Sequence, residues 1–146
     1  MEDVPAVAAI EKECFSLPWS EKSFEDSIHR EDTVFLVCVD EEVETQADTA
    51  GCVVGYVGMY LSFEEGEITN VAVTPSYRKR GCGQQLLSAI KQEAVERKAE
   101  SILLEVRKSN EPALSLYKKN GFKEIGIRKN FYERPVEDAI IMKVGL

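Results

Sequence analysis

The stretch from Val71 to Gln84 (VAVTPSYRKRGCGQ) constrains the fold of this chain more than any other. An apolar run typical of a strand ends at Pro75, a basic turn with two glycines follows, and an apolar stripe at helical spacing comes directly after it. Such a strand, turn and helix bring backbone N–H groups and the positive end of the helix dipole together. With three consecutive basic residues, the pattern predicts a phosphate or pyrophosphate site. An ordinary helix start with solvated basic residues is the alternative interpretation.

Two common phosphate-binding motifs do not fit this turn. A nucleotide P-loop needs Gly-Lys followed by Ser or Thr, but Gly83 is followed by two glutamines. A dinucleotide-binding turn needs a third glycine, and Leu86 stands in its place. The ligand is therefore expected to carry phosphate without being held by either motif.

The rest of the chain alternates helical and strand patterns without a linker, which predicts a single domain over residues 1–146. The order predicts a mixed α/β fold with a central sheet covered by helices on both faces. Gly55 and Gly58 predict a bulge in the second strand, and residues 40–50 are interpreted as an acidic turn. The expected helices cover residues 4–15, 20–30, 84–98 and 110–121, and the expected strands cover 33–39, 51–62, 67–73, 101–107, 122–127 and 138–144.

Composition excludes several function classes. A net charge of −8 argues against nucleic acid as the main partner and fits a basic partner or an amine, although acidity is also a common solubility device. No apolar run is long enough for a membrane span, and the acidic start at Met1 does not resemble a signal peptide. Four cysteines without a CxxC pair and one histidine predict neither a zinc site nor a disulfide framework, hence a reduced, cytoplasmic setting.

Several motifs carry a resemblance to a known family. Arg78, Gly81 and Gly83 match Gln/Arg-x-x-Gly-x-Gly/Ala, and the chain resembles the GNAT superfamily of acetyltransferases, which has this signature between a strand and a helix. Over nearly its whole length it resembles the ribosomal-protein alanine N-acetyltransferase (RimI) branch, which acetylates the N-terminal alanine of small-subunit ribosomal protein number eighteen. The segments that carry this likeness are SLPWS at 16–20, LEVR at 104–107, Asn110, ALxLY at 113–117, GF at 121–122 and EDAIIM at 137–142.

The resemblance implies a GNAT fold with a mostly antiparallel sheet and a site for acetyl-coenzyme A without a metal. In the family, the loop backbone binds the pyrophosphate and the preceding strand pairs with the pantetheine arm. The family also has a strand before its first helix; here either the sheet lacks that edge strand or the native chain starts earlier. The implied cofactor-binding residues are Val71, Ala72, Val73, Arg78, Lys79, Arg80, Gly81, Cys82, Gly83, Gln84, Asn110 and Tyr117.

Two residues are candidates for proton transfer. Strand alternation separates Glu105 from the apolar face of its strand, so it either is solvated or points into a cleft. Tyr117 lies on an apolar helical stripe and by itself would be interpreted as a core aromatic residue. The resemblance implies that Glu105 is the general base, directly or through water, and that Tyr117 is the general acid.

Three aromatic residues are candidates for contacting the substrate. Phe15 ends the first expected helix, Trp19 lies in the turn that follows, and Tyr132 lies in the last expected loop. Aromatic side chains at such places commonly anchor a loop. The resemblance implies that their segments flank the N-terminus of a basic ribosomal-protein segment. The sequence does not determine the oligomeric state, and a monomer is the favoured expectation. A lysine side chain or a small-molecule amine stays open as the acceptor. A non-catalytic acyl-coenzyme A-binding module is a further alternative.

Overall fold

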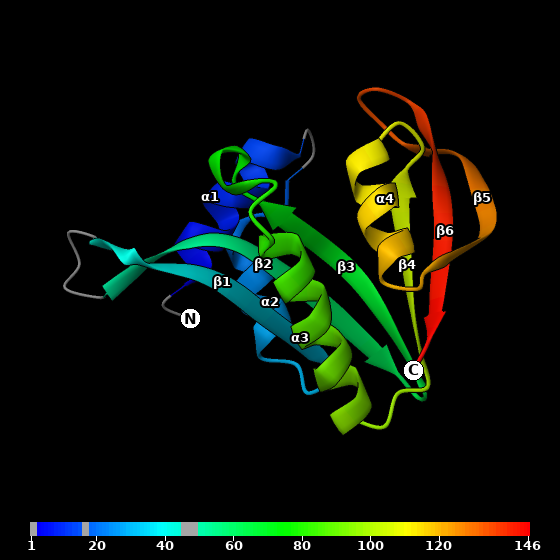
Figure 1. Ribbon diagram of the computed structural model, residues 1–146, viewed down its shortest axis with the longest axis horizontal. Helices are drawn as coiled ribbons and strands as arrows, with labels where there is room; N and C mark the ends of the chain where they lie inside the picture. The colour runs from blue at the N-terminus through cyan, green and yellow to red at the C-terminus, as the bar shows by residue number, and fades with distance from the viewer. Residues whose placement is uncertain (1–2, 16–17, 45–49) are drawn as a thin grey trace.

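The computed structural model describes residues 3–15, 18–44 and 50–146. Within these ranges, six strands form one sheet in the order β1-β2-β3-β4-β6-β5, and only the β3–β4 pair is parallel (Figure 1). This confirms the predicted mixed, mostly antiparallel sheet. The elements are α1 (Val4–Cys14), α2 (Glu21–Ile28), β1 (Thr33–Glu44), β2 (Ala50–Ser62), β3 (Glu65–Val73), a 3-10 turn η1 (Pro75–Tyr77), α3 (Cys82–Glu96), β4 (Ser101–Arg107), α4 (Glu111–Lys119), β5 (Lys123–Tyr132) and β6 (Glu137–Gly145).

The interpretation of residues 40–50 as a turn was wrong at both ends. β1 continues to Glu44 and β2 begins at Ala50, and these two residues are paired across the strands. Residues 45–49 lie outside the described ranges. Towards the N-terminus, no strand precedes α1 among the described residues, and β1 forms one edge of the sheet.

Other boundaries also differ from the sequence-based expectation, whereas the bulge predicted in β2 is confirmed. β5 continues to Tyr132, five residues past the expected end, because its pairing with β6 continues to Glu137. α3 starts at Cys82, so the second glycine of the motif lies inside the helix. The bulge expected in β2 is present, since Val54 has no partner in the register between β1 and β2.

Helices cover both faces of the sheet, as predicted. Neighbouring β2 residues Tyr56 and Val57 are both 0% exposed, because successive side chains point to opposite faces. Tyr56 packs in a cluster with α1 and α2, whereas Val57 packs in the larger cluster with α3 and α4. Figure 1 shows α3 and α4 in front of the sheet and α1 and α2 behind it. No helix in the described ranges is long and apolar enough to cross a membrane.

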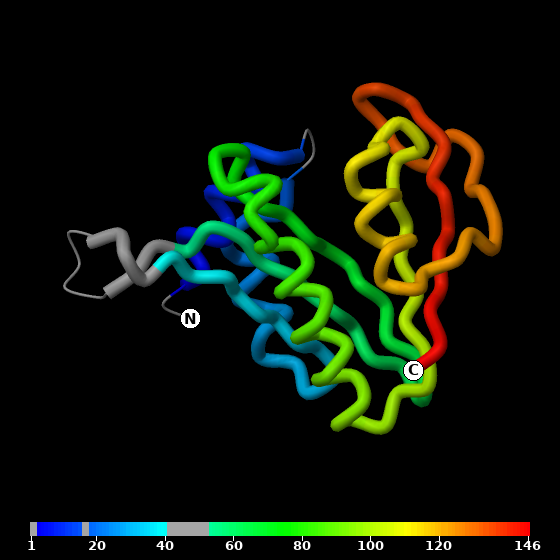
Figure 2. The backbone as a smooth tube through the Cα atoms, in the orientation of Figure 1, coloured from blue at the N-terminus to red at the C-terminus, as the bar shows by residue number. Residues whose placement is uncertain are grey.

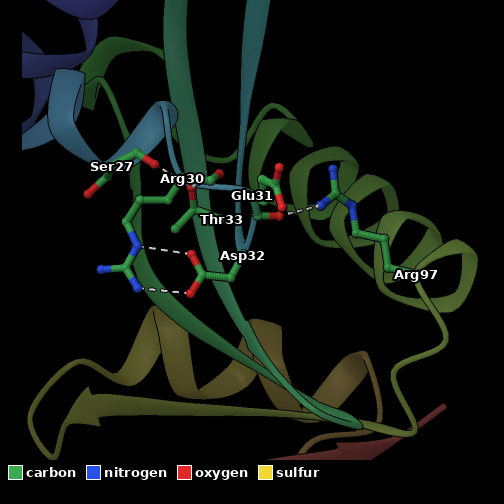
Figure 3. Close-up of polar contacts among 6 residues, drawn as sticks. All are labelled: Ser27, Arg30, Glu31, Asp32, Thr33 and Arg97. Carbon is green, nitrogen blue, oxygen red and sulfur yellow. Dashed lines mark hydrogen bonds and ion pairs between the residues drawn. The ribbon is translucent and has the colours of Figure 1, made fainter.

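The connection between α2 and β1 is fixed by polar contacts (Figure 3). Arg30 donates two hydrogen bonds to the Asp32 carboxylate, at 2.9 and 2.8 Å, and Thr33 Oγ1 donates to the Arg30 carbonyl at 3.1 Å. Arg97, at the end of α3, donates to the Glu31 carbonyl at 3.3 Å. These bonds join the start of the edge strand to helices on both faces.

The central strands β3 and β4 separate towards their C-terminal ends. Their parallel pairing ends at Ile68 and Leu104, although β3 continues to Val73 and β4 to Arg107. Beyond that point β3 is paired only with β2, and β4 only with β6. The two halves of the sheet therefore open into a wedge, which can be followed in Figure 2.

A bulge in β3 accompanies this separation. Met59 pairs with Ile68 and Gly58 with Asn70, so that Thr69 has no partner on β2. An extra residue bends a strand and exchanges the faces to which the following side chains point. Sequence analysis did not predict this bulge, because Thr69 lies in an ordinary β-branched run without a glycine.

Candidate active site

A cleft of about 690 Å³ lies where β3 and β4 separate. Its walls come from these two strands, from the segments on either side of the α1–α2 connection, and from α4 and the β5–β6 loop. The structure thus brings together residues that are more than 100 positions apart in the sequence. The predicted site residues that line the cleft are Phe15, Trp19, Val71, Glu105, Asn110, Tyr117 and Tyr132.

Glu105 has the environment of a proton acceptor. Its strand neighbours Leu104 and Val106 point into the α3 core, so Glu105 points to the opposite face and into the cleft. The side chain is 13% exposed, with Oε1 3.5 Å from Arg128 Nη1 and a buried Oε2 that has no hydrogen-bond partner among the described residues. Burial raises the pKa of the carboxyl, Arg128 lowers it in part, and Glu67 adds a smaller increase.

Tyr117 is both a core residue and a cleft residue. Its ring is buried and meets Phe122 edge-on, with centroids 5.8 Å apart. Burial, and to a lesser extent Tyr132, raises the pKa of Tyr117, so the hydroxyl keeps its proton at neutral pH. Burial and the Glu105 carboxylate similarly raise the pKa of Tyr132 to about 12, with Arg107 opposing them. Both tyrosines therefore present proton donors to the cleft.

Arg107 holds the β5–β6 loop against the cleft. Its guanidinium donates to the carbonyl oxygens of Glu133 and Pro135, both at 3.0 Å, and pairs with Glu137 at 3.3 Å. It also lies 4.5 Å from the centroid of the Tyr132 ring. Sequence analysis noted Arg107 only as part of the LEVR segment. A planar group with several donors suits this role, because it reaches three acceptors at once.

Glu11 is a buried carboxylate that sequence analysis missed. It is 2% exposed and lines the cleft. Oε1 accepts a hydrogen bond from the Tyr56 hydroxyl at 2.5 Å, and Oε2 accepts from the Trp19 backbone N–H at 2.9 Å and from Asn70 Nδ2 at 3.3 Å. These bonds attach the segment that carries Trp19 to the sheet.

A sequence signal for Glu11 did exist. Val4 and Val7 begin the buried stripe of α1, and Glu11 occupies the next position at helical spacing, where an apolar residue would be expected. Asn70 likewise stands within an apolar strand. Polar residues at core positions need hydrogen-bond partners, and each of these two supplies one to the other.

The phosphate-binding motif forms the turn into α3. Gly81 is the N-cap with φ of 85°, and Lys79 also has a positive φ of 64°. Gly81 has no side chain to cap the helix, and the first bond of the helix runs from the Gln85 N–H to the Gly81 carbonyl, at 3.0 Å. The N–H groups of residues 82–84 therefore stay available at the positive end of the helix dipole, which fits a pyrophosphate.

Two of the three basic side chains of this turn are engaged within the protein. Arg78 donates to the Val73 carbonyl at 3.1 Å and to Cys14 Sγ at 3.4 Å. The Arg80 guanidinium lies 4.9 Å from the centroid of the Tyr77 ring. The loop backbone and the helix dipole thus provide the main attraction for an anion, and these side chains add charge beside it.

Other residues of the motif have packing roles. A side chain at Gly83 would lie 2.9 Å from Leu116, so this glycine lets α3 approach α4 closely. The Gln84 side chain exchanges two hydrogen bonds with Asn120, at 2.7 and 2.9 Å. Burial and the neighbouring Cys38 raise the pKa of the Cys82 thiol to about 12, which makes it a poor nucleophile.

The Val71–Val73 segment can pair with an extended ligand. The Thr74 N–H donates to the Val54 carbonyl at 2.8 Å. Because hydrogen-bonded pairs alternate in an antiparallel ladder, Ala72 also bonds to β2, whereas Val71 and Val73 direct their backbone groups into the wedge. The side chain of Ala72, which lies between them in the strand, packs in the cluster formed with α1 and α2.

Asn110 caps α4, as predicted, by accepting a hydrogen bond from the Ala113 N–H at 3.2 Å. It also lines the cleft, so its amide nitrogen is available to a ligand there. Within the part of the chain that the structure describes, no three metal-ligating side chains gather at one place.

Comparison with known proteins identifies the class that this fold and site define. The model of the acetyltransferase (GNAT) family matches residues 4–122, and the chain belongs to this family. Over 146 aligned residues it is 35% identical to the putative [ribosomal protein bS18]-alanine N-acetyltransferase of Bacillus subtilis, covering all of this chain and 91% of that protein.

Two further relatives agree with this. The chain is 34% identical to the [ribosomal protein bS18]-alanine N-acetyltransferase of Escherichia coli K12, with 99% of this chain and 92% of that protein covered. The crystal structure of the ribosomal-protein-S18-alanine N-acetyltransferase from Escherichia coli superposes with a TM-score of 0.82 at 31% identity, covering 99% of this chain and 88% of that one.

Proposed function

We propose that this protein transfers an acetyl group from acetyl-coenzyme A to the N-terminal α-amine of ribosomal protein bS18, which begins with alanine. The observation that carries the proposal is the cleft, where Glu105 and Tyr117 meet the aromatic residues of the two flanking segments. The names of the relatives supply the substrate. We further propose that residues 1–146 act as one catalytic domain.

Glu105 acts as the general base, directly or through one water molecule. An α-amine has a pKa near 8 and must lose a proton before it can attack a thioester, so a carboxylate with a raised pKa suffices. Acetyl-coenzyme A, when bound, supplies the thioester. The free Oε2 of Glu105 is the atom best suited to accept the proton, because Oε1 is next to Arg128.

The wedge and Tyr117 complete the reaction. A backbone N–H of Val71 or Val73 stabilises the negative charge that develops on the carbonyl oxygen during attack. Tyr117 then donates its proton to the departing thiolate, and burial keeps the hydroxyl protonated for this step. The turn at Gly81 and the start of α3 hold the pyrophosphate of coenzyme A. Asn110 contacts the pantetheine arm, which runs from the pyrophosphate to the thioester.

The charge of the chain supports a basic protein segment as the partner. The sequence carries 26 acidic and 18 basic residues, and opposite charge accelerates the encounter with a basic peptide. Phe15, Trp19 and Tyr132 all line the cleft and are available to contact such a segment. We place the reaction in the cytoplasm, where ribosomal proteins are made, and favour a monomer.

The test uses the purified chain, acetyl-coenzyme A and a short peptide copied from the start of bS18. The control is the same peptide with a blocked N-terminus and an added lysine. A single acetyl group on the α-amine, identified by fragmentation mass spectrometry, supports the proposal. Acetylation of the blocked peptide would assign a lysine acetyltransferase instead. Coenzyme A binding without acetylation of either peptide would refute the proposed substrate class.

A further inference from the structure

The Asn70 side chain ends in an oxygen without a partner. Asn70 is 7% exposed and lines the cleft. Its Nδ2 donates to Glu11 Oε2 at 3.3 Å, whereas its buried Oδ1 has no hydrogen-bond partner among the described residues. A buried acceptor in this state is unfavourable unless a water molecule or a ligand satisfies it. The oxygen therefore marks a position where a donor group of a ligand can bind.

Glu11 determines which end of the Asn70 amide faces the ligand. Both oxygens of Glu11 act as acceptors, and Oε2 accepts from Asn70 Nδ2, so the amide nitrogen faces Glu11 and the amide oxygen faces away from it. Glu11 is itself held by the Tyr56 hydroxyl and by the Trp19 N–H. The orientation of the amide is thus fixed before any ligand binds.

The bulge at Thr69 brings this amide to the same face of the sheet as the base. Ile68 packs in the α3 core, but two residues later Asn70 bonds to α1 on the other face. Glu105 lies on that face as well, because Leu104 and Val106 occupy the α3 side of β4. An amine in the wedge therefore has Glu105 on the β4 side and Asn70 on the β3 side.

We propose that Asn70 is a specificity-determining residue, which accepts a hydrogen bond from the substrate α-amine, and that Glu11 is the residue that positions it. The inference rests on the proposed function. An ammonium group has three N–H donors, so it can bind Asn70 Oδ1 while another N–H faces Glu105. After one proton has passed to Glu105, a second N–H of the amine stays bonded to Asn70 Oδ1, which holds the nitrogen in the wedge for its attack on the thioester.

The experiment compares two peptides bound to the coenzyme A complex of the full chain. One begins with alanine, and the other carries a propionyl group in its place and so lacks the amine. Wild type is expected to prefer the alanine peptide, and Asn70→Ala is expected to reduce that preference by roughly 10-fold, the effect of one hydrogen bond to a charged group. Because the preference is a ratio within one protein sample, a change in the folded fraction cancels.

Exchange of donor and acceptor provides the second test. Glu11→Gln introduces an N–H that can bond to Asn70 Oδ1 and turn the amide, so the preference should fall. The double variant Glu11→Gln with Asn70→Asp again directs an oxygen into the cleft, and the preference should return. A purely structural role for the pair predicts instead that the single variants change the affinity for both peptides equally, so that the preference does not fall.

The outcomes separate this inference from the proposed function. Loss of preference in both single variants and its return in the double variant support the inference. If wild type acetylates the alanine peptide but Asn70→Ala weakens both peptides equally, the inference is overturned while the proposed function stands. If wild type neither binds nor acetylates the alanine peptide, the proposed function fails and the inference fails with it.

Discussion

Replacement of Arg107 by lysine tests whether the β5–β6 loop forms part of the peptide site. Lysine keeps the positive charge but carries it at one point, whereas the arginine plane reaches Glu133, Pro135 and Glu137 together. We therefore expect Arg107→Lys to loosen this loop and the adjacent Tyr132. The affinity for coenzyme A should not change, because the phosphate turn lies on other elements of the fold.

The magnitude follows from the contacts that are lost. Arg107 is 26% exposed, so each bond to a carbonyl is assigned the lower value for a charged donor, about 1.5 kcal/mol. Lysine can keep one of these two bonds but loses the other, together with about 0.5 kcal/mol from the contact with the Tyr132 ring. The closed loop is thus destabilised by about 2 kcal/mol, equivalent to an increase in peptide KM of at most about 30-fold.

The assay measures kcat and KM for the peptide, the Kd for coenzyme A and hydrogen exchange of residues 133–136. Arg97→Lys is the matched control, since Arg97 also binds a backbone carbonyl and a glutamate but lies at the end of α3 and does not line the cleft. A raised KM with faster exchange in Arg107→Lys alone supports the reasoning. An unchanged peptide KM, or an equal effect in the control, would refute it.

Four further predictions concern the catalytic groups and the phosphate turn. Glu105→Gln should lower kcat by about 10²- to 10⁴-fold with little change in coenzyme A affinity, and unchanged turnover across pH would contradict its role as the base. Tyr117→Phe keeps the buried ring, so it should lower kcat roughly 10²-fold while thermal unfolding changes little; equal kcat values would exclude the hydroxyl as the acid. Arg128→Met removes the charge that lowers the pKa of Glu105, so the acidic limb of the pH profile of kcat/KM should move to higher pH, and a shift to lower pH would be inconsistent with this pair. Gly81→Ala places a side chain on a residue with positive φ and should lower the free energy of unfolding by about 1–2 kcal/mol, measured by urea denaturation. The control is Gly145→Ala, because Gly145 has open space around it and no positive φ; equal stabilities of the two variants would show that the positive φ at Gly81 does not require glycine.

The local chemistry of the strand, turn and helix could be predicted from sequence. Pro75 ends an apolar strand and Gly81 permits the positive φ that starts α3, and both effects depend only on neighbouring residues. The same holds for Asn110 as a cap, since its acceptor lies three residues away. Alternation along β4 similarly assigned Glu105 to the face opposite Leu104.

What the sequence alone could not determine depends on contacts between distant segments. The bulge at Thr69 is visible only in its pairing with β2, and the partners of Glu11 come from 8 to 59 residues away along the chain. The second glycine of the motif was predicted to serve the ligand, and its additional packing role beside Leu116 is visible only in the tertiary structure. Local patterns thus predicted most of the elements and a phosphate-binding type of turn, because backbone conformation responds to near neighbours. Tertiary structure decided where β3 and β4 separate and on which face of the sheet Glu105 and Asn70 meet. The physical reason is that the separation of two strands depends on the strands with which each of them is paired.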